Sequence, residues 1–355
     1  MRNIFKHILS VIPACSMILF SCSDWTDPES LNIHIPSIEE QNPELYAQYV
    51  KSLNDYKTSE HQVVIASIDN VSSMPSSRSQ HLTDMPDSID YICLNNIMEV
   101  NEVNRSEMKE VRELGTKVLG LADFDAIESV WRAILEEESN AAANTDVEEE
   151  EGSETVDNAT RFIEYCKSEV AKRITAADAL GTDGIIVNFT GFDLNVLNEE
   201  GIVAETARQA AFFDAVINWK KANVNKALIF KGAPQNIISK DFLSDCKYII
   251  INAHSAKNQS EMSYLTLMAL VKDVPTDRFV MGTTTPYLTN TGALNGKFSD
   301  DSSAITGAAQ WAIVKAPDYT KAGISIDAAE QDYFNITKIY PNIREAINIL
   351  SPTVK

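Results

Sequence analysis

The chain of 355 residues carries 51 acidic and 30 basic side chains, and its formal net charge is −21 at pH 7. Such an acidic chain disfavours nucleic acids and anionic membrane surfaces as partners. Its length suits one large domain, and its five scattered histidines offer no metal-ligand spacing. The sequence also lacks phosphate-loop and dinucleotide fingerprints, so neither a metal nor a cofactor is predicted.

An export leader is predicted at the start of the chain. Arg2 and Lys6 precede an apolar run that contains Pro13 and is too short for a membrane-spanning helix. The Leu-Phe-Ser-Cys sequence that ends at Cys22 resembles a lipobox, where a bacterial signal peptidase cleaves before a cysteine that receives lipid. We therefore expect residues 1–21 to be a lipoprotein signal peptide and Cys22 to carry the acyl chains, palmitate among them.

A polar tether is predicted over residues 22–40. Its first part, Cys-Ser-Asp-Trp-Thr-Asp, resembles the acidic export signal of surface lipoproteins in glycan-foraging Gram-negative anaerobes. This resemblance implies a protein of the outer membrane that faces the cell exterior and touches the membrane through its lipid anchor only. It also implies an outer-membrane importer and other surface lipoproteins as partners.

Residues 41–355 are predicted to form one domain. A first helix begins after Asn42, a good N-cap, with Pro43 at its first position. Beyond it, eight short apolar runs alternate with amphipathic helical patterns, which is the count of a TIM (β/α)8 barrel, an α/β fold. The predicted strands are residues 62–69, 89–95, 117–124, 184–189, 226–231, 247–253, 278–284 and 323–327. The helical patterns include residues 126–135, 159–180, 205–221 and 261–272.

An acidic insertion is predicted at residues 136–157. The segment carries ten acidic side chains, four of them consecutive glutamates, and no Lys or Arg. Self-repulsion and the shortage of apolar residues predict a disordered or extended loop after the third strand and its helix. A calcium loop would need Asp-x-Asp-x-Asp-Gly spacing, which the segment lacks.

The fourth predicted strand carries the most informative motif. Residues 183–190 read Asp-Gly-Ile-Ile-Val-Asn-Phe-Thr and follow a long amphipathic helix. The segment resembles the catalytic strand of the family 18 glycoside hydrolases, the chitinases and endo-β-N-acetylglucosaminidases, whose motif is Asp-Gly-x-Asp-x-Asp-x-Glu. The resemblance extends over residues 41–350 through the order of the elements, and it implies the TIM barrel of that family.

The resemblance also implies which chemical groups this strand lacks. In the family the Glu protonates the leaving glycosidic oxygen, and a neighbouring Asp orients a substrate acetamide that acts as nucleophile. Here the three functional positions hold Ile186, Asn188 and Thr190, which share one face because successive side chains of a strand alternate in direction. An aliphatic alcohol cannot replace the Glu, since its pKa lies far above the working pH.

Two further strands depart from the family pattern at their sugar-facing ends. Residues 248–254 resemble a sixth-strand sequence of endo-β-N-acetylglucosaminidases that ends Gln-Ala-Tyr and contacts the N-acetyl group, with Asn252 and His254 at those polar positions. Residues 321–327 resemble an eighth strand that ends in an aromatic residue, which Asp327 replaces. Departures on three strands favour a lineage released from catalysis.

Candidate sugar-binding residues follow from the expected fold. Sugars are held by aromatic faces and planar polar groups, and TIM-barrel sites assemble at the C-terminal ends of the strands. Each candidate has a structural alternative: Asn188 could satisfy hydrogen bonds inside the barrel, His254 could be a core histidine, and Phe192 could plug an empty pocket. The predicted carbohydrate-binding residues are Asn188, Thr190, Phe192, Asn252, His254, Tyr287 and Asp327, and Gln235 and Asn236 are further candidates.

Three functions remain open from the sequence. The favoured one is a non-catalytic surface lipoprotein that binds a glycan containing N-acetylglucosamine and works beside an active endoglycosidase and an importer in a polysaccharide or N-glycan utilisation system. The second is an active hydrolase in which Asp193 or Asp327 supplies a relocated acid. The third is a structural subunit without sugar binding. Under the favoured function no catalytic residue is assigned.

Overall fold

The computed structural model describes residues 38–143, 157–288, 294–334 and 337–352. The predicted leader, Cys22 and all but the last three residues of the predicted tether lie outside the described residues. None of the helices in the described part is long and apolar enough to cross a membrane.

The chain divides into two units, residues 1–48 and residues 49–355. The described part of the first unit holds helix α3 (Ile38–Gln41) and the beginning of α4 (Pro43–Thr58). The side chain of Asn42 accepts a hydrogen bond from the backbone N–H of Leu45 at 3.1 Å, so Asn42 is the N-cap that the sequence predicted.

The second unit is built on a closed barrel of eight parallel strands in the order β1-β10-β7-β6-β5-β4-β3-β2. All eight predicted strands are present, and their bounds differ from the predicted ones by at most two residues. A two-stranded antiparallel hairpin, β8 (Tyr287–Leu288) with β9 (Leu294–Asn295), was not predicted. The barrel strands are β1 (Val63–Ile68), β2 (Tyr91–Leu94), β3 (Lys117–Asp123), β4 (Gly184–Phe189), β5 (Ala227–Gly232), β6 (Tyr248–Asn252), β7 (Phe279–Thr284) and β10 (Lys321–Asp327).

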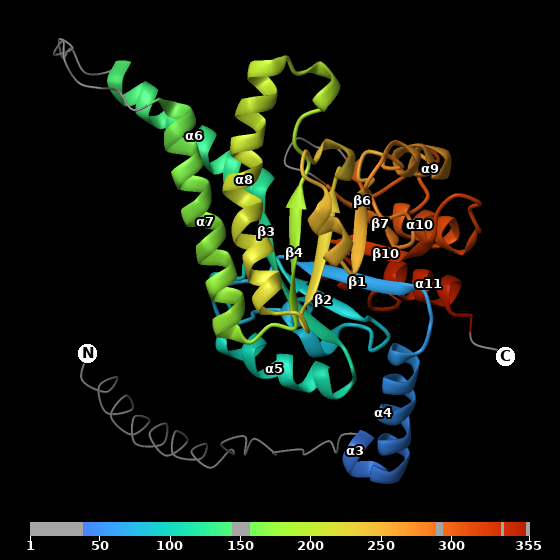
Figure 1. Cartoon of the computed structure of the whole chain (residues 1–355). Helices are drawn as coiled ribbons and strands as arrows, with labels where there is room; N and C mark the ends of the chain where they lie inside the picture. Colours follow the sequence, from blue (N-terminus) through green and yellow to red (C-terminus); the bar gives the residue numbers. More distant parts are fainter. Residues whose placement is uncertain (1–37, 144–156, 289–293, 335–336, 353–355) are drawn as a thin grey trace, which may run out of the picture. The chain divides into compact units, whose positions relative to one another are not determined.

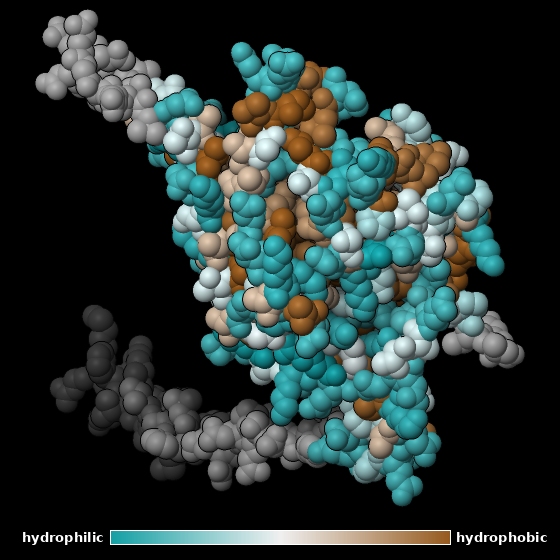
Figure 2. Space-filling view, viewed as in Figure 1, coloured by the Kyte–Doolittle hydropathy of each residue, from teal (hydrophilic) through white to brown (hydrophobic). Residues whose placement is uncertain are grey.

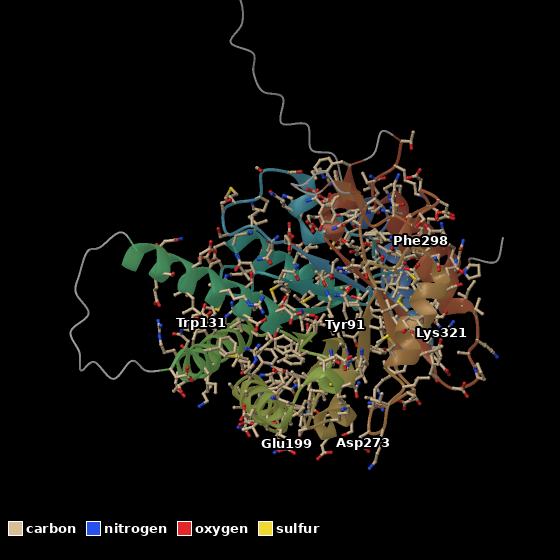
Figure 3. The ribbon with its side chains drawn as sticks, turned by 90° about the horizontal axis from the view of Figure 1, so that it is seen from above. Tyr91, Trp131, Glu199, Asp273, Phe298 and Lys321 are labelled. Carbon is tan, nitrogen blue, oxygen red and sulfur yellow. The ribbon has the colours of Figure 1, made fainter. Side chains whose placement is uncertain are left out.

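Alternating side chains divide the apolar residues of the strands into two layers. The outward set, such as Ile185 and Val187 on β4, packs against the surrounding helices. In the view from above, Tyr91 lies within the ring of strands and Trp131 lies outside it on α6 (Figure 3). The inward set fills the barrel and comprises Val63, Ile65, Tyr91, Cys93, Leu119, Ile186, Ile229, Ile250 and Val280.

Helices cover the outside of the barrel, and Figure 1 shows α7 and α8 side by side next to β4. Helix α7 ends at Gly181, whose φ of 69° is a left-handed conformation that glycine adopts without strain. This turn feeds the chain directly into β4. The helices of the second unit after α4 are α5 (Glu102–Glu113), α6 (Phe124–Ala143), α7 (Asn158–Leu180), α8 (Glu199–Ala222), α9 (Gln259–Met268), α10 (Ala304–Ile313) and α11 (Pro341–Leu350).

Two helical segments differ from the sequence prediction. Helix α6 continues to Ala143, so the first part of the predicted acidic loop, residues 136–143, is helical, while residues 144–156 lie outside the described residues. The alanines and glutamates of this part favour a helix, which outweighs their charge repulsion. Helix α9 ends at Met268 rather than at residue 272, and it buries Met262 and Thr266, whereas Met268 and Val271 are exposed.

The described cysteines and the tryptophans of the barrel domain belong to the core. Cys93 lies inside the barrel, and Cys166 and Cys246 lie in the layer between strands and helices. Burial raises the pKa of each of these thiols to about 12. Trp131, Trp219 and Trp311 are all buried.

Candidate functional site

Polar side chains replace the apolar filling at one end of the barrel. On β3, β4 and β5 the residues Asp123, Asn188 and Lys231 are paired in register, so they form a row at one level. Asn188 and Lys231 follow the inward Ile186 and Ile229 by two residues, so they also point inward. The site therefore begins where the apolar layers of the barrel end.

Asn188 links two carboxylates that the sequence analysis did not single out. Its Nδ2 donates to Asp123 Oδ1 at 2.8 Å and to Asp125 Oδ2 at 3.3 Å, and its Oδ1 is buried without a partner among the described residues. Asp125 Oδ1 accepts the backbone N–H of Thr190 at 3.1 Å. Burial raises the pKa of Asp123, although hydrogen bonds from Asn188 and from the backbone of Ala126 oppose the shift.

Lys231 forms an ion pair across the barrel with Asp327 of β10, a residue 96 positions away in sequence. The same carboxylate oxygen lies 2.9 Å from Nε2 of His254. Burial favours a raised pKa for Asp327, but the charge of Lys231 and hydrogen bonds from His254 and Lys231 hold its pKa well below the usual range. For Lys231, burial is outweighed by the charge of Asp327 and the pKa is raised. Both side chains are therefore charged.

A depression of about 390 Å³ lies beside this ion pair, near the ends of β5 and β6. Gly232 at the end of β5 has a φ of 127°, and a Cβ there would lie 2.1 Å from the carbonyl oxygen of Phe189, so only glycine allows β5 to approach β4 so closely. The depression contains no Lys, Arg, Asp or Glu among its lining residues. They are Thr190, Gly232, Ala233, Gln235, Ile251, Asn252, His254, Ser255 and Leu265.

The structure brings five of the seven predicted site residues together. Thr190, Asn252 and His254 line the depression. Asn252 Oδ1 also accepts the backbone N–H of His254 at 3.1 Å. Asp327 is joined to this group through His254, and Asn188 is joined to it through Asp125 and Thr190.

Phe192 and Tyr287 do not line the depression. Phe192 is 43% exposed, and the guanidinium of Arg208 lies 5.4 Å from the centre of its ring, so it does not plug the mouth. Phe192 and Val196, which precede α8, and Val203 in its first turns are exposed apolar residues, and Figure 2 shows hydrophobic side chains gathered at the surface in this region. Tyr287 lies on the β8–β9 hairpin, where its hydroxyl accepts a hydrogen bond from Asn295.

Neither acid that the sequence suggested for a relocated catalytic role is suited to it. Asp193 is exposed and caps the short helix Leu194–Val196 by accepting the backbone N–H of Asn195 at 2.9 Å. Asp327 is ionised and paired, and a carboxylate with a depressed pKa is a poor proton donor near neutral pH. The candidate Gln235 lines the depression, whereas Asn236 Nδ2 is bound to the carbonyl oxygen of Thr190 at 2.8 Å.

Sequence reasoning missed Asp123, Asp125 and Lys231. Lys231 is the last residue of the predicted strand at residues 226–231. Its position two residues after the inward Ile229 is the signal that could have found it, because a lysine on the inward face of a barrel strand needs a carboxylate partner. Asp123 could have been found the same way, from its two-residue spacing to Leu121 and Leu119 on β3.

A closed (β/α)8 barrel with polar groups gathered at the C-terminal ends of its strands is the architecture of TIM-barrel proteins whose sites lie at that mouth. The sequence profile described as "Glycoside hydrolase family 18, BT1044-like" matches residues 26–349. The chain therefore belongs to this family. No curated protein matches the sequence significantly.

Solved structures support the fold. A selenomethionine form of BT1044 with a glutamate-to-glutamine substitution superposes with a TM-score of 0.59 and 14% identity, over 90% of this chain and 98% of that one. The endo-β-N-acetylglucosaminidase from Cordyceps militaris, in its apo form, gives a TM-score of 0.55 and 16% identity, over 85% of this chain and 95% of that one. At these identities the likeness concerns the fold alone.

Proposed function

We propose that the protein is a non-catalytic, glycan-binding member of its family. One observation carries the proposal: Thr190 follows β4 at the position where the family motif has its general acid, and its backbone N–H is held by Asp125. Asn188 stands at the preceding functional position and is committed to Asp123 and Asp125. General acid catalysis contributes on the order of 10²–10⁴-fold, and a threonine cannot supply it.

The depression beside Thr190 supports binding. It combines amide, hydroxyl and imidazole groups with the apolar Ile251 and Leu265, which is the mixture that sugar rings require. The related Cordyceps protein is an endo-β-N-acetylglucosaminidase. A glycan containing N-acetylglucosamine is therefore the ligand class that we propose for this chain.

We further propose that Cys22 anchors the protein in the outer membrane, facing the exterior, beside an importer and other surface lipoproteins. A lipid group with several acyl chains holds a protein on a membrane far more firmly than an acidic body, which anionic lipids repel. Cys22→Ser should release the protein from the membrane fraction, with Cys166→Ser as the control because that thiol is buried. A Cys22→Ser protein that still fractionates with the outer membrane contradicts this proposal.

The binding proposal is tested by a glycan array on the mature domain together with hydrolysis assays on N-glycans and chitin oligomers. We expect binding to at least one glycan with N-acetylglucosamine, loss of that binding in Asn252→Ala, and no turnover. An absence of binding to all glycans, together with no turnover, would favour the structural-subunit function instead.

A second candidate function rests on Asp123 and Asp125. The two carboxylates are joined through Asn188, and burial raises the pKa of Asp123, which suits that carboxyl to donate a proton. They could serve a hydrolase with its acid on β3. Turnover by the purified protein that disappears in Asp123→Asn but persists in the surface control Asp214→Asn would establish this function in place of the binding one.

A further inference from the structure

His254 is oriented by its neighbours on both sides. Its Nε2 lies 2.9 Å from Asp327 Oδ2, and its backbone N–H donates to Asn252 Oδ1 at 3.1 Å. A carboxylate can only accept, so Nε2 must carry the proton. In the neutral imidazole the other nitrogen, Nδ1, is then an acceptor with a free lone pair.

Asp327 is itself fixed and neutralised. Lys231 reaches it across the barrel and donates to the same oxygen that accepts a hydrogen bond from His254 Nε2. Lys231 is 8% exposed and lies where water cannot easily replace its partner. Lys231 and His254 therefore hold the same oxygen of the carboxylate, and the charge of Lys231 balances that of Asp327 without a positive charge on the imidazole.

The depression offers further acceptors. The Oε1 atom of Gln235 is buried without a hydrogen-bond partner among the described residues, and Gln235 lines the depression together with His254. No lysine or arginine lines the depression, and the carboxylate of Asp125 binds the backbone N–H of Thr190 at its edge. A sugar with hydroxyl donors suits this arrangement, whereas a sugar carrying a carboxylate would meet uncompensated negative charge.

We propose that Asp327 and Lys231 are positioning residues that hold His254 as a neutral acceptor, and that His254 selects an uncharged sugar unit through one of its hydroxyl donors. This inference rests on the proposed glycan binding and names its ligand class more narrowly. It assigns the ion pair a role in recognition rather than in catalysis.

The first test reads the protonated nitrogen directly. Nitrogen-15 spectra of histidine-labelled protein should show a bare Nδ1 and a protonated Nε2 for His254 at neutral pH. Lys231→Met/Asp327→Leu removes both charges and the acceptor of the His254 hydrogen bond. In this variant the imidazole of His254 should no longer be held in the tautomer that is protonated at Nε2. A protonated Nδ1 in the unmodified protein, or unchanged spectra in the double variant, overturns the inference without involving any glycan.

The second test measures binding by calorimetry, with a desialylated biantennary N-glycan and its sialylated form as probes. His254→Phe should weaken binding of the neutral probe on the order of tenfold or more, about 1.4 kcal/mol per tenfold. His61→Phe is the matched control, since His61 also contacts a carboxylate, Asp90 at 2.8 Å, but precedes β1 at the opposite end of that strand. Its binding should match that of the unmodified protein.

The outcomes separate this inference from the proposed function. Binding that His254→Phe leaves unchanged, or a preference for the sialylated probe, overturns the role of His254 while glycan binding stands. Failure of the unmodified protein to bind either probe or any array glycan defeats both. Weakened binding in His254→Phe with a normal His61→Phe supports the inference.

Discussion

The side chains at the two ends of β4 have different kinds of hydrogen-bond partners. At the N-terminal end, Asp183 Oδ2 accepts from Arg112 Nε and from the backbone N–H of Val118, both at 2.8 Å. At the C-terminal end, the side chain of Asn188 binds Asp123 and Asp125, and the backbone N–H of Thr190 binds Asp125. Asp183 matches the family motif, whereas Asn188 and Thr190 depart from it.

This difference distinguishes a residue that the fold requires, Asp183, from positions that only the family's catalytic chemistry would require. Asp183 joins α5, β3 and β4, and loss of its carboxylate would leave a guanidinium and a backbone N–H without their acceptor. Asn188 and Thr190 make hydrogen bonds at the mouth instead. Under the proposed non-catalytic function, the first end would keep its family residue and the second would change.

The largest effect on stability is expected from breaking the ion pair between Lys231 and Asp327. A large loss would show that the C-terminal mouth of the barrel also contributes to the stability of the fold. Lys231→Met leaves Asp327 buried without its cation, with only the His254 imidazole beside it, and breaking a buried ion pair typically costs about 3–5 kcal/mol of unfolding free energy. Lys231→Met/Asp327→Leu should recover most of that loss. Urea unfolding followed by circular dichroism measures both. Equal stability of the single and double variants would contradict the prediction.

At the other end of β4, Asp183→Ala should cost about 2 kcal/mol, because a backbone N–H and a partly exposed Arg112 lose their acceptor together. Glycan binding should be unaffected. The control is Asp193→Ala at the mouth, where only an exposed cap is lost and about 1 kcal/mol is expected. A larger loss in the control than in Asp183→Ala would reverse the comparison of the two ends.

A smaller, pH-dependent effect is expected for Asp327. Its pKa in the folded protein is held well below the ordinary aspartate value of about 3.9. A carboxyl whose pKa is lower in the folded than in the unfolded state stabilises the fold above the unfolded value, and this contribution is lost as the pH falls through the folded value. The stability gap between the unmodified protein and Asp327→Asn should therefore narrow below about pH 4. A stability gap that widens below about pH 4 would show that folding raises, rather than lowers, the pKa of Asp327.

The smallest effect is expected from restoring a carboxylate at the family position. Thr190 is exposed, so Thr190→Glu should change the unfolding free energy by less than about 0.5 kcal/mol. Hydrolysis of chitin oligomers should remain at background, since Ile186 and Asn188 cannot orient a substrate. Turnover that appears in Thr190→Glu would mean that the mouth has kept more of the catalytic arrangement than we infer.

The barrel could be predicted because each of its strands can be recognised from a short stretch of sequence. Each strand is a short run of buried apolar residues between turn signals, and the eight runs give the correct count and order. The family motif at Asp183 and Gly184 then fixed which strand is the fourth. The end of α9 was predicted less well, because the sequence pattern contains Met268 and Val271 although the helix stops before Val271.

The polar connections of the mouth could not be predicted, because they depend on distances across the barrel. Lys231 and Asp327 lie on strands that are separated by β6 and β7 in the barrel order. The sequence around either residue does not indicate that the other is its partner. Likewise, the attachment of Asn188 to Asp123 requires the register of β3 against β4. The sequence could place His254 at the mouth but could not show that its Nε2 faces Asp327.

The three buried thiols make the opening of the molecule measurable. The thiolate is the form of cysteine that reacts with thiol reagents. Cys93, Cys166 and Cys246 are buried, and burial raises the pKa of each thiol to about 12. Their labelling rates in the native protein will therefore follow conformational opening rather than intrinsic reactivity. Because Cys93 lies inside the barrel and the other two lie under the helices, labelling resolved by mass spectrometry distinguishes detachment of the helices from rupture of the barrel.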